Sequence, residues 1–470
     1  MLLTIVSFIV LLLILIFVHE LGHFLVAKLL GVGVDSFSLG FPPRIWSKKI
    51  GETVYQVCWL PLGGYVKLCG EEPGDDVPPE KLAKSFNHKP VWVRIAVVFA
   101  GPLFNLVFAF LAMWALVMAI GVSHAPSTVG MIPEDGPAYR AGLRYGDLVT
   151  GIDGREVSFY DQIEEIQELS DGSPVAVSVE RDGAARTFQV TPRREDARDM
   201  LGDSSPYWSL GLRPLLRTEV GRVVPGKPAD LAGLRPGDLI TAIDGRAIRD
   251  WVELEEIVQG PAEGRGKPGP VDIKPLNFEV LRDGRTMSFM ITPVAEPSQN
   301  LDGETVYTPL ISISSRPTAV RERVGPFRAA HFSLRDCWNI TTLTFSVLGK
   351  IVSHKISPKV MGGPILIAEQ AGLSIRSGLD DFIFLMVLIS INLAIINLVP
   401  LPVFDGGQIL IFLVEGVRRK PLSLRVREVS QMVGVGALVA LMVLVFYNDI
   451  SRIVTRRGGP PPAVQTGQAE

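Results

Sequence analysis

The stretch LLTIVSFIVLLLILIFVHELGHFLVAKLL occupies residues 2–30, and it indicates what kind of protein this is. No charged residue precedes the HELGH motif at 19–23. Because a helix needs about 20 apolar residues to cross a bilayer, the stretch predicts a membrane span. A cleaved signal peptide would need a basic start and a small-residue cleavage site, and neither is visible here. We therefore expect this segment to remain as a membrane helix.

The HELGH motif places two imidazoles and a carboxylate on that helix. His19 and His23 are four residues apart, so they share one helix face and can bind one metal ion. Glu20 follows the first histidine, as the general base does in HExxH metalloproteases. Ionisable residues within a span are costly and usually serve a function, although a polar cluster that joins helices is the alternative. The motif predicts zinc ligands His19 and His23 and a catalytic Glu20.

A third ligand is expected elsewhere, because catalytic zinc usually takes three protein ligands and keeps one position open. A later apolar stretch at 382–399 leads into NLVPLPVFDGG, residues 397–407. Asp405 follows two prolines that end the helix, and we expect Gly406 and Gly407 to free the backbone to turn. Asp405 is the predicted third metal ligand; a plain helix C-cap is the alternative.

The whole chain contains four predicted spans, at 2–30, 91–122, 382–399 and 429–450. Basic residues gather between spans one and two and between spans three and four, which favours a cytoplasmic position for both loops. They are Lys28, Arg44, Lys48, Lys49, Lys67, Lys81, Lys84 and Lys89, then Arg418, Arg419, Lys420, Arg425 and Arg427. The metal site then falls toward the cytoplasmic side, and the N-terminus, the C-terminus and the central insert lie outside. Three basic residues after span four argue weakly against this. A net charge of −3 gives no indication of nucleic-acid binding.

The insert contains an internal repeat. Residues 136–154 read GPAYRAGLRYGDLVTGIDG and residues 227–245 read KPADLAGLRPGDLITAIDG, an offset of 91. A repeat of this length predicts two copies of one structural unit, and its β-rich runs and GLRxGD motif resemble PDZ domains, which bind peptides at a sheet edge. Steric gating and peptide binding, including C-termini, remain equal alternatives. The predicted PDZ-loop residues are Gly142, Leu143, Gly146, Asp147, Gly233, Leu234, Gly237 and Asp238.

Further residues are candidates for substrate binding. The run TVYQVCWLPLGGYVKL at 53–68 predicts a β-hairpin that turns at Gly63 and Gly64; it either offers a strand edge to substrate or is a plain surface hairpin. Asn397 either contacts substrate or joins helices. For Asn105 in span two, the helix-joining interpretation is favoured. The predicted substrate-binding residues are Asn397, Gly63, Gly64, Tyr65, Pro400 and Pro402.

The motifs HELGH, GFPPRIWSKK, PLGGYVKL, GPLFN and NLVPLPVFDGG occur in this order around the repeats. Together they resemble the site-2 protease family of intramembrane zinc metalloproteases, over the chain up to about residue 450. The resemblance implies Zn²⁺ as cofactor and a place in the bacterial inner membrane, with the repeats periplasmic. It implies cleavage of single-span substrates of the anti-sigma factor type after a first cut, and of signal-peptide remnants. A non-catalytic PDZ scaffold in the membrane is the alternative function.

We therefore expect a polytopic α-helical membrane protein of four transmembrane helices, with two tandem PDZ-like α/β domains inserted between helices two and three. The expected boundaries are 1–124 for the N-terminal membrane half with its cytoplasmic β-hairpin loop, 125–216 and 217–316 for the PDZ-like domains, and 317–375 for an amphipathic surface helix and a re-entry segment. The C-terminal membrane half follows at 376–452 and a disordered tail at 453–470.

Overall fold

A computed structural model describes residues 2–71, 77–198, 201–260, 273–300, 302, 304–316, 320–420 and 422–457. The chain forms two compact units. Among the described residues, the first contains those within 2–121, 324–353 and 361–451, and the second contains those within 122–323, 354–360 and 452–457. A Gly/Pro-rich loop that the sequence predicts at 260–270 lies, apart from Gly260, outside the described residues.

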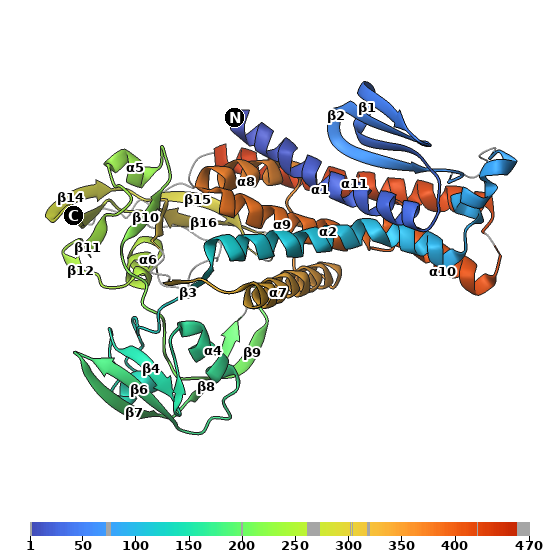
Figure 1. The fold of residues 1–470 in the computed structure, drawn as a ribbon. Helices are drawn as coiled ribbons and strands as arrows, with labels where there is room; N and C mark the ends of the chain where they lie inside the picture. Colours follow the sequence, from blue (N-terminus) through green and yellow to red (C-terminus); the bar gives the residue numbers. More distant parts are fainter. Residues whose placement is uncertain are drawn as a thin grey trace. The chain divides into compact units, whose positions relative to one another are not determined.

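The first unit consists mainly of long helices (Figure 1). They are α1 (Leu2–Leu29), α2 (Val91–Ile120), α7 (Pro326–Val352), α8 (Pro364–Ser377), α9 (Leu379–Asn397), α10 (Asp405–Arg418) and α11 (Leu424–Arg457). Within the described residues, four segments are long and apolar enough to cross a membrane: Leu2–Leu29, Val91–Ile120, Leu379–Asn397 and Arg425–Val454. These coincide with the four predicted spans, so that prediction is confirmed on length and composition.

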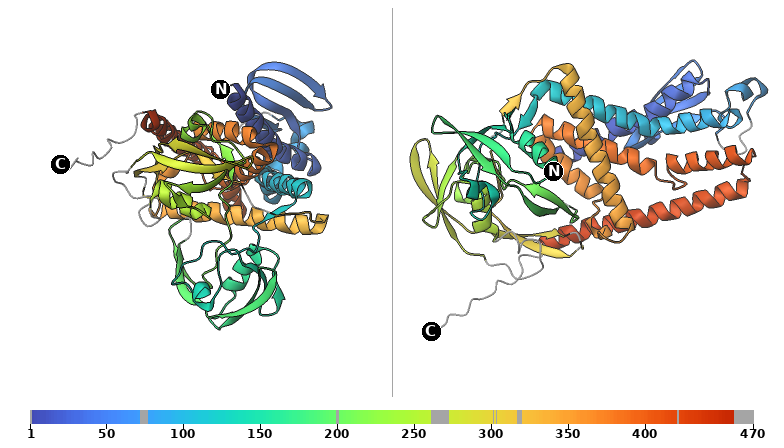
Figure 2. Two further views of the ribbon diagram at one scale, coloured as in Figure 1. Left: turned by 90° about the vertical axis from the view of Figure 1, so that its left-hand side faces the viewer. Right: turned by 90° about the horizontal axis from the view of Figure 1, so that it is seen from below.

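One prediction about helix extent needs correction. Helix α11 continues to Arg457, so residues 453–457 are helical where the sequence predicts a disordered tail; residues 458–470 lie outside the described part of the chain. The re-entry segment is a regular helix, α8, introduced by Pro364 at its first position, where a missing backbone N–H does no harm. Helix α7 lies within the segment 317–375, where the sequence predicts an amphipathic helix. Figure 2 shows it running across α2, which it contacts, rather than alongside it.

Helices α1 and α2 pack closely at the level of the HELGH motif. Gly22 on α1 faces α2 so tightly that a Cβ atom there would lie 2.4 Å from the carbonyl oxygen of Ala100. Helix α2 also contacts α9 and α10. A glycine at this point lets two backbones approach, as small residues do in membrane helix pairs. The close packing brings the histidines of α1 against the surface of α2.

Strands β1 (Val34–Ile50) and β2 (Thr53–Leu68) follow α1, and they correct the predicted hairpin. The chain turns at Gly51 and Glu52, between Ile50 and Thr53, and not at the glycine pair. Residues 46–50 pair with 53–57, while residues 36–39 pair with 54–57 on one side and 64–67 on the other. Both strands therefore bend. Within the described pairings, residues 64–67 pair only with residues 36–39, so they form an edge of the sheet. Between β2 and α2 lie the short helices η1 (Pro79–Lys84) and η2 (Phe86–His88).

In the second unit the two repeats fold alike. The first contains a sheet of order β5-β4-β6-β7 and the second a sheet of order β12-β11-β13-β14, and each also has a two-stranded ladder, β8-β9 or β15-β16. The first repeat has α3 (Pro137–Ala141), β4 (Leu148–Ile152), β5 (Arg155–Glu156), α4 (Tyr160–Glu168), β6 (Val175–Arg181), β7 (Ala184–Val190), β8 (Arg193–Arg198) and β9 (Ser204–Ser209). The second has β10 (Val220–Val223), α5 (Pro228–Ala232), β11 (Leu239–Ile243), β12 (Arg246–Ala247), α6 (Trp251–Gln259), β13 (Leu276–Arg282), β14 (Arg285–Ile291), β15 (Val294–Gln299), β16 (Thr305–Leu310) and β17 (Ile313–Ser315). Strands β3 (Val122–His124) and β18 (Val320–Glu322) pair with each other.

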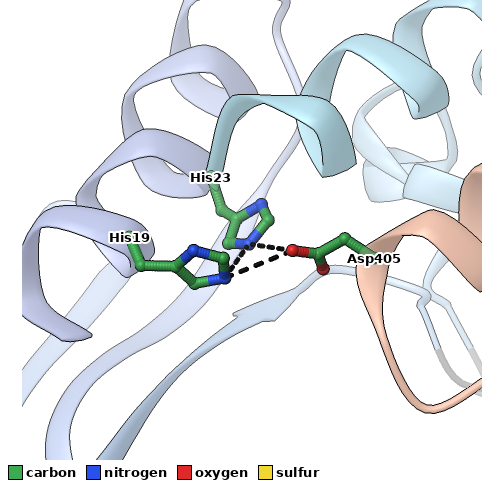
Figure 3. A group of neighbouring side chains, drawn as sticks. All are labelled: His19, His23 and Asp405. Atoms are coloured by element: carbon green, nitrogen blue, oxygen red, sulfur yellow. Dashed lines mark hydrogen bonds and ion pairs between the residues drawn. The ribbon is translucent and has the colours of Figure 1, made fainter. Parts of the chain in front are cut away.

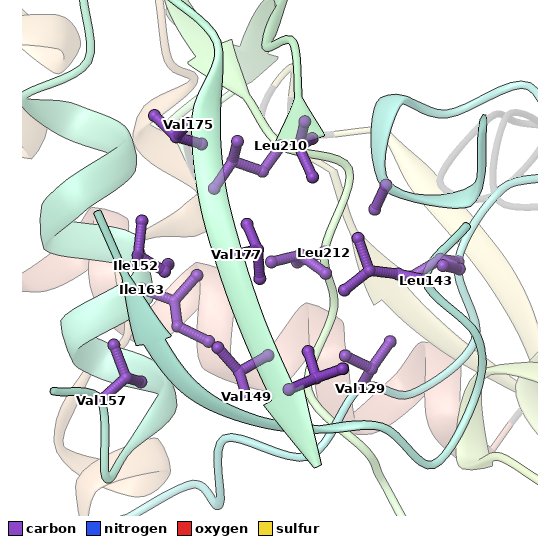
Figure 4. Close-up of a cluster of buried hydrophobic side chains, with 14 of the residues drawn as sticks. Val129, Leu143, Val149, Ile152, Val157, Ile163, Val175, Val177, Leu210 and Leu212 are labelled. Atoms are coloured by element: carbon purple, nitrogen blue, oxygen red, sulfur yellow. The ribbon is translucent and has the colours of Figure 1, made fainter. Parts of the chain in front are cut away.

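Each repeat has its own apolar core. In the first, Val175, Val177 and Val179 alternate along β6 and are buried. Figure 4 shows Val175 and Val177 in the same cluster as Leu143 and Ile163. Because alternate residues of a strand face the same side of a sheet, this spacing places the three valines in one layer. The second repeat buries an equivalent set that includes Leu234, Phe278 and Val280.

Candidate metal centre

The three predicted metal ligands converge at one point, although Asp405 follows His23 by more than 380 residues in sequence (Figure 3). The Nε2 atoms of His19 and His23 are 3.2 Å apart. Asp405 Oδ2 lies 3.2 Å from His19 Nε2 and 3.7 Å from His23 Nε2. The three side chains are largely buried, with exposed fractions of 12%, 14% and 14%. Three atoms that can all donate lone pairs thus face one another.

This donor set fits a zinc ion. Zinc with bonds of 2.0–2.2 Å in tetrahedral geometry holds its ligand atoms about 3.4 Å apart, close to the separations observed here. Asp405 Oδ2 is also buried without a hydrogen-bond partner among the described residues. A buried carboxylate oxygen normally has such a partner, so its position among imidazole nitrogens is better explained by a shared cation.

The turn between α9 and α10 places Asp405. Helix α9 ends at Asn397, and Asp405 is the first residue of α10. Gly406 and Gly407 are helical, which corrects the prediction that they free the backbone to turn. A Cβ at Gly406 would lie 2.2 Å from the carbonyl oxygen of Leu398, and one at Gly407 would lie 2.1 Å from that of Leu401. The glycines therefore allow α10 to start directly against the turn that precedes it.

Glu20 lies on α1 beside strand β2. A Cβ atom at Gly64 would be 3.1 Å from Glu20 Cγ and 2.9 Å from the carbonyl oxygen of Ser38. The backbone N–H of Val66 donates to the Glu20 carboxylate. The edge of β2 therefore runs past the predicted catalytic base, and the absence of a side chain at Gly64 makes this close approach sterically allowed.

The predicted substrate-binding residues are divided between the metal centre and a neighbouring cavity. Asn397 Nδ2 lies 3.5 Å from His19 Nε2. Tyr65 and Pro402 line a cavity of about 510 Å³, which Lys67 and Gln408 also border. Gly63 lies under the Phe41 ring, where a Cβ would be 2.2 Å from Cε2. Pro400 is exposed.

Helix α2 contributes to this site in a way that the sequence predicts only in part, through the helix-joining role favoured for Asn105. Val97, Gly101 and Asn105 occur every four residues and therefore share one helix face. The carbonyl oxygen of Val97 is 2.9 Å from His23 Nδ1, and Asn105 Nδ2 is 3.3 Å from His19 Nδ1. A Cβ at Gly101 would lie 2.3 Å from His23 Nε2. The GPLFN motif contains two of these residues, but only the packing of α2 on α1 relates them to the histidines.

In the repeats, the predicted loop residues form a turn with an internal ion pair. Arg181 donates to both carboxylate oxygens of Asp147, at 2.6 and 2.7 Å, and Arg282 does the same for Asp238 at the same distances. Leu143 and Leu234 are buried in the cores. Gly142 and Gly233 are left-handed C-cap residues, and their carbonyl oxygens accept from Arg181 and Arg282, respectively. Gly146 and Gly237 also have positive φ angles. These contacts give the motif a structural role; peptide binding there stays a prediction.

Comparisons with known proteins place this geometry in a family. A model of peptidase family M50 matches residues 7–441. The chain belongs to peptidase family M50. As an M50 peptidase of the site-2 protease type, it is a metallopeptidase that uses zinc. The regulator of sigma-E protease RseP of Escherichia coli is 35% identical over 464 residues, which cover 95% of this chain and 98% of that protein.

Two further similarities extend the comparison. A relative from Neisseria meningitidis with a zinc metalloprotease name is 34% identical to this M50 peptidase over 466 residues, 96% of this chain and 99% of that one. The PDZ domain of an SdrC-like protein from Listeria monocytogenes is 20% identical, with a TM-score of 0.16, over 20% of this chain and 90% of that structure. That score carries no argument, so the PDZ-like nature of the repeats stays a prediction.

Proposed function

We propose that this M50 peptidase cuts the membrane-spanning segments of single-span membrane proteins. The observation that carries the proposal is the place of the donor cluster. His19 and His23 lie within α1, Asp405 follows the end of α9, and both helices are long and apolar enough to cross a membrane. Metal-ligating side chains on such helices bring the hydrolytic centre to the substrate's own depth in the bilayer.

The roles of the site residues follow from their chemistry. We infer that His19, His23 and Asp405 hold the zinc ion. Zinc, when bound, lowers the pKa of a coordinated water to about 7 and polarises a carbonyl group. The Glu20 carboxylate takes the proton of the attacking water and passes it to the nitrogen of the leaving amine. Asn397, beside His19, donates its amide hydrogens to the substrate carbonyl oxygen.

The edge of β2 can hold an unwound substrate segment. Peptide bonds in a membrane helix are hydrogen-bonded internally, so a substrate must unwind before it can be cut, and lipid cannot satisfy the groups that are freed. Residues 64–67 have one partner strand among the described pairings and pass Glu20. An extended substrate segment can add to this edge as a strand. Tyr65 and Pro402 then contact the substrate beside the cavity that they line.

The substrate class and orientation complete the proposal. The chain is a bacterial inner-membrane protein. Its basic loops support an orientation with the metal centre toward the cytoplasm and the repeats in the periplasm. Relatives named as regulators of sigma-E protease support a role in the envelope stress response through release of an anti-sigma factor. Signal-peptide remnants are further substrates of the same form, and the repeats take peptide C-termini or limit substrate size.

Co-expression with a single-span protein of the anti-sigma type, shortened to resemble the product of a first cut, tests the function. We expect the wild type to produce a shorter fragment whose new end maps within the span. Glu20→Gln removes the base and should lower the cleavage rate by about 100-fold or more, with zinc still bound. Glu428→Gln, an exposed position on α11, is the matched control. Equal cleavage by Glu20→Gln and the wild type would leave a non-catalytic membrane scaffold as the better explanation.

A further inference from the structure

The face of α2 that meets the two histidines contains a residue whose partners are incomplete. Asn105 is fully buried, and its side-chain amide lies 3.3 Å from His19 Nδ1. Its Oδ1 atom has no hydrogen-bond partner among the described residues. A buried amide oxygen without a donor is unfavourable by about 1–3 kcal/mol, so this arrangement calls for an explanation.

The second histidine shows how α2 orients an imidazole. His23 Nδ1 lies 2.9 Å from the carbonyl oxygen of Val97. A carbonyl oxygen only accepts, so a neutral His23 ring carries its hydrogen on Nδ1 and its lone pair on Nε2, the nitrogen that faces His19 and Asp405. Metal-binding histidines commonly fix the outer nitrogen in this way, and the contact sets both the tautomer and the orientation of the ring.

The same requirement applies to His19. Its Nε2 also faces Asp405, so a neutral ring that offers this nitrogen to a metal carries its hydrogen on Nδ1. The group opposite Nδ1 must then accept, and the amide of Asn105 can accept only through Oδ1. The oxygen and nitrogen of an amide are assigned from the surrounding hydrogen bonds, and the ring–amide contact favours the orientation with Oδ1 toward His19.

We propose that Asn105 is a positioning residue for the metal centre: its amide oxygen holds His19 through Nδ1 and so presents Nε2 to the zinc. Gly101, one turn earlier, provides the space in which both rings fit, because a Cβ there would lie 2.7 Å from His19 Cε1 and 2.3 Å from His23 Nε2. Asn105 thus acts through His19 and does not itself bind zinc. The inference rests on the proposed zinc role of His19, His23 and Asp405.

A simple helix-joining role for Asn105 predicts different behaviour, and the chain contains an example of that role. Thr344 on α7 donates to Asn392 Oδ1 on α9 at 2.8 Å, a bond between two helices in which neither partner is a residue of the metal centre. Asn392 is therefore the matched control: the same residue type in a span of the same unit.

The test measures zinc affinity of the purified full-length protein by competition with a chelator, alongside its thermal midpoint. Asn105→Leu should weaken zinc binding by roughly 10- to 100-fold, the usual effect of removing an outer partner of a metal-binding histidine. The zinc affinity of Asn392→Leu should stay within about threefold of the wild-type value, even if its thermal midpoint falls as much as that of Asn105→Leu. Asn105→Asp keeps an acceptor and removes the donor, so it should retain most of the affinity.

Each other outcome counts against the inference. Zinc binding by Asn105→Leu equal to the wild type overturns it, and so does an equal loss in Asn392→Leu, because the effect would then be general loosening of the helices. A loss in Asn105→Asp as large as in Asn105→Leu overturns the acceptor role. Failure of the wild type to bind zinc would reject the proposed metal centre itself, an outcome distinct from all of these.

Discussion

Gly101 on α2 lies against the proposed metal ligands His19 and His23 and leaves no room for a side chain there. A methyl group at this position would lie 2.3 Å from His23 Nε2 and 2.7 Å from His19 Cε1, well inside van der Waals contact. We expect Gly101→Ala to displace at least one imidazole from its place beside Asp405. Because a misplacement of about 1 Å can lower a rate by about 100-fold, cleavage should fall to that extent, and zinc affinity should fall with it.

Gly436→Ala is the control for this change. Gly436 lies on α11, another candidate span, where an added Cβ meets nothing within 4 Å. The same substitution there should leave zinc content and cleavage unchanged. Full zinc occupancy and normal cleavage in Gly101→Ala, measured by metal analysis and fragment yield, would show that the rings have more room than the structure indicates.

Individual residues of this site differ in how far the sequence reveals them. His19 and His23 are predictable because the four-residue spacing fixes a common helix face, and the prolines before Asp405 mark where the third span ends. The contact from Val97 cannot be predicted from the sequence, because it uses a backbone carbonyl group, which every residue has. Asn105 is visible as a polar residue in a span, but its partner depends on which face of α2 turns toward α1.

At the scale of elements, the two glycine pairs depart most from what the sequence predicts. Gly63 and Gly64 suggest a turn, yet they lie within β2, and neither has a positive φ angle. Both positions need a residue without a side chain because other groups lie close to them. Gly63 lies against the Phe41 ring, and Gly64 lies against Ser38 and Glu20. Close approach depends on a second segment that a local pattern does not contain, so the sequence cannot distinguish it from a turn. The membrane helices were predictable because length and apolarity alone define them.

A buried ion cluster fixes α10, the helix that Asp405 begins. Glu415 accepts from Arg94 of α2 at 2.9 Å, from Arg427 of α11 and from the backbone N–H of Leu422. Its side chain is 3% exposed. Removing one partner of a buried ion pair leaves an uncompensated charge, so Glu415→Gln should lower stability by on the order of 3 to 5 kcal/mol. The measurement is the thermal midpoint in detergent, with the exposed Glu428→Gln as control.

The pH dependence of the stability difference between the wild type and Glu415→Gln tests whether the charge of Glu415 causes it. Burial raises the pKa of Glu415, but the hydrogen bonds from Leu422, Arg427 and Arg94 outweigh it, and the pKa lies below its ordinary value. A carboxyl group with a lowered folded pKa stabilises the fold above its unfolded pKa, and that contribution is lost as the pH falls through the folded value. The gap between wild type and Glu415→Gln should therefore be full at neutral pH and shrink below about pH 4. A gap that is constant with pH would assign the loss to packing.

For the whole molecule, the question is what the two repeats add to the membrane enzyme. The offset of 91 residues predicts that they are copies, and the matching sheet orders agree. Their function was not readable from sequence, because the motif residues that suggested a ligand loop are used in cores and ion pairs. Size exclusion and peptide binding predict opposite effects on substrates, so removing the repeats can separate them.

The structure shows where to make that deletion. His124 of β3 pairs with Val320 of β18, so these two residues lie side by side, and removal of residues 125–316 leaves residues 317–319 to join them. If the repeats exclude large substrates, the shortened enzyme should cleave a full-length, uncut substrate that the wild type leaves intact, and should still cleave the pre-cut form. Removal of binding domains would instead slow cleavage of the pre-cut form and leave the uncut form intact. Fragment yields from both substrates decide between them, and Glu20→Gln in the shortened enzyme shows that any new cut arises at the same site. Continued resistance of the uncut substrate would reject the gate, because an obstacle that has been removed cannot account for it.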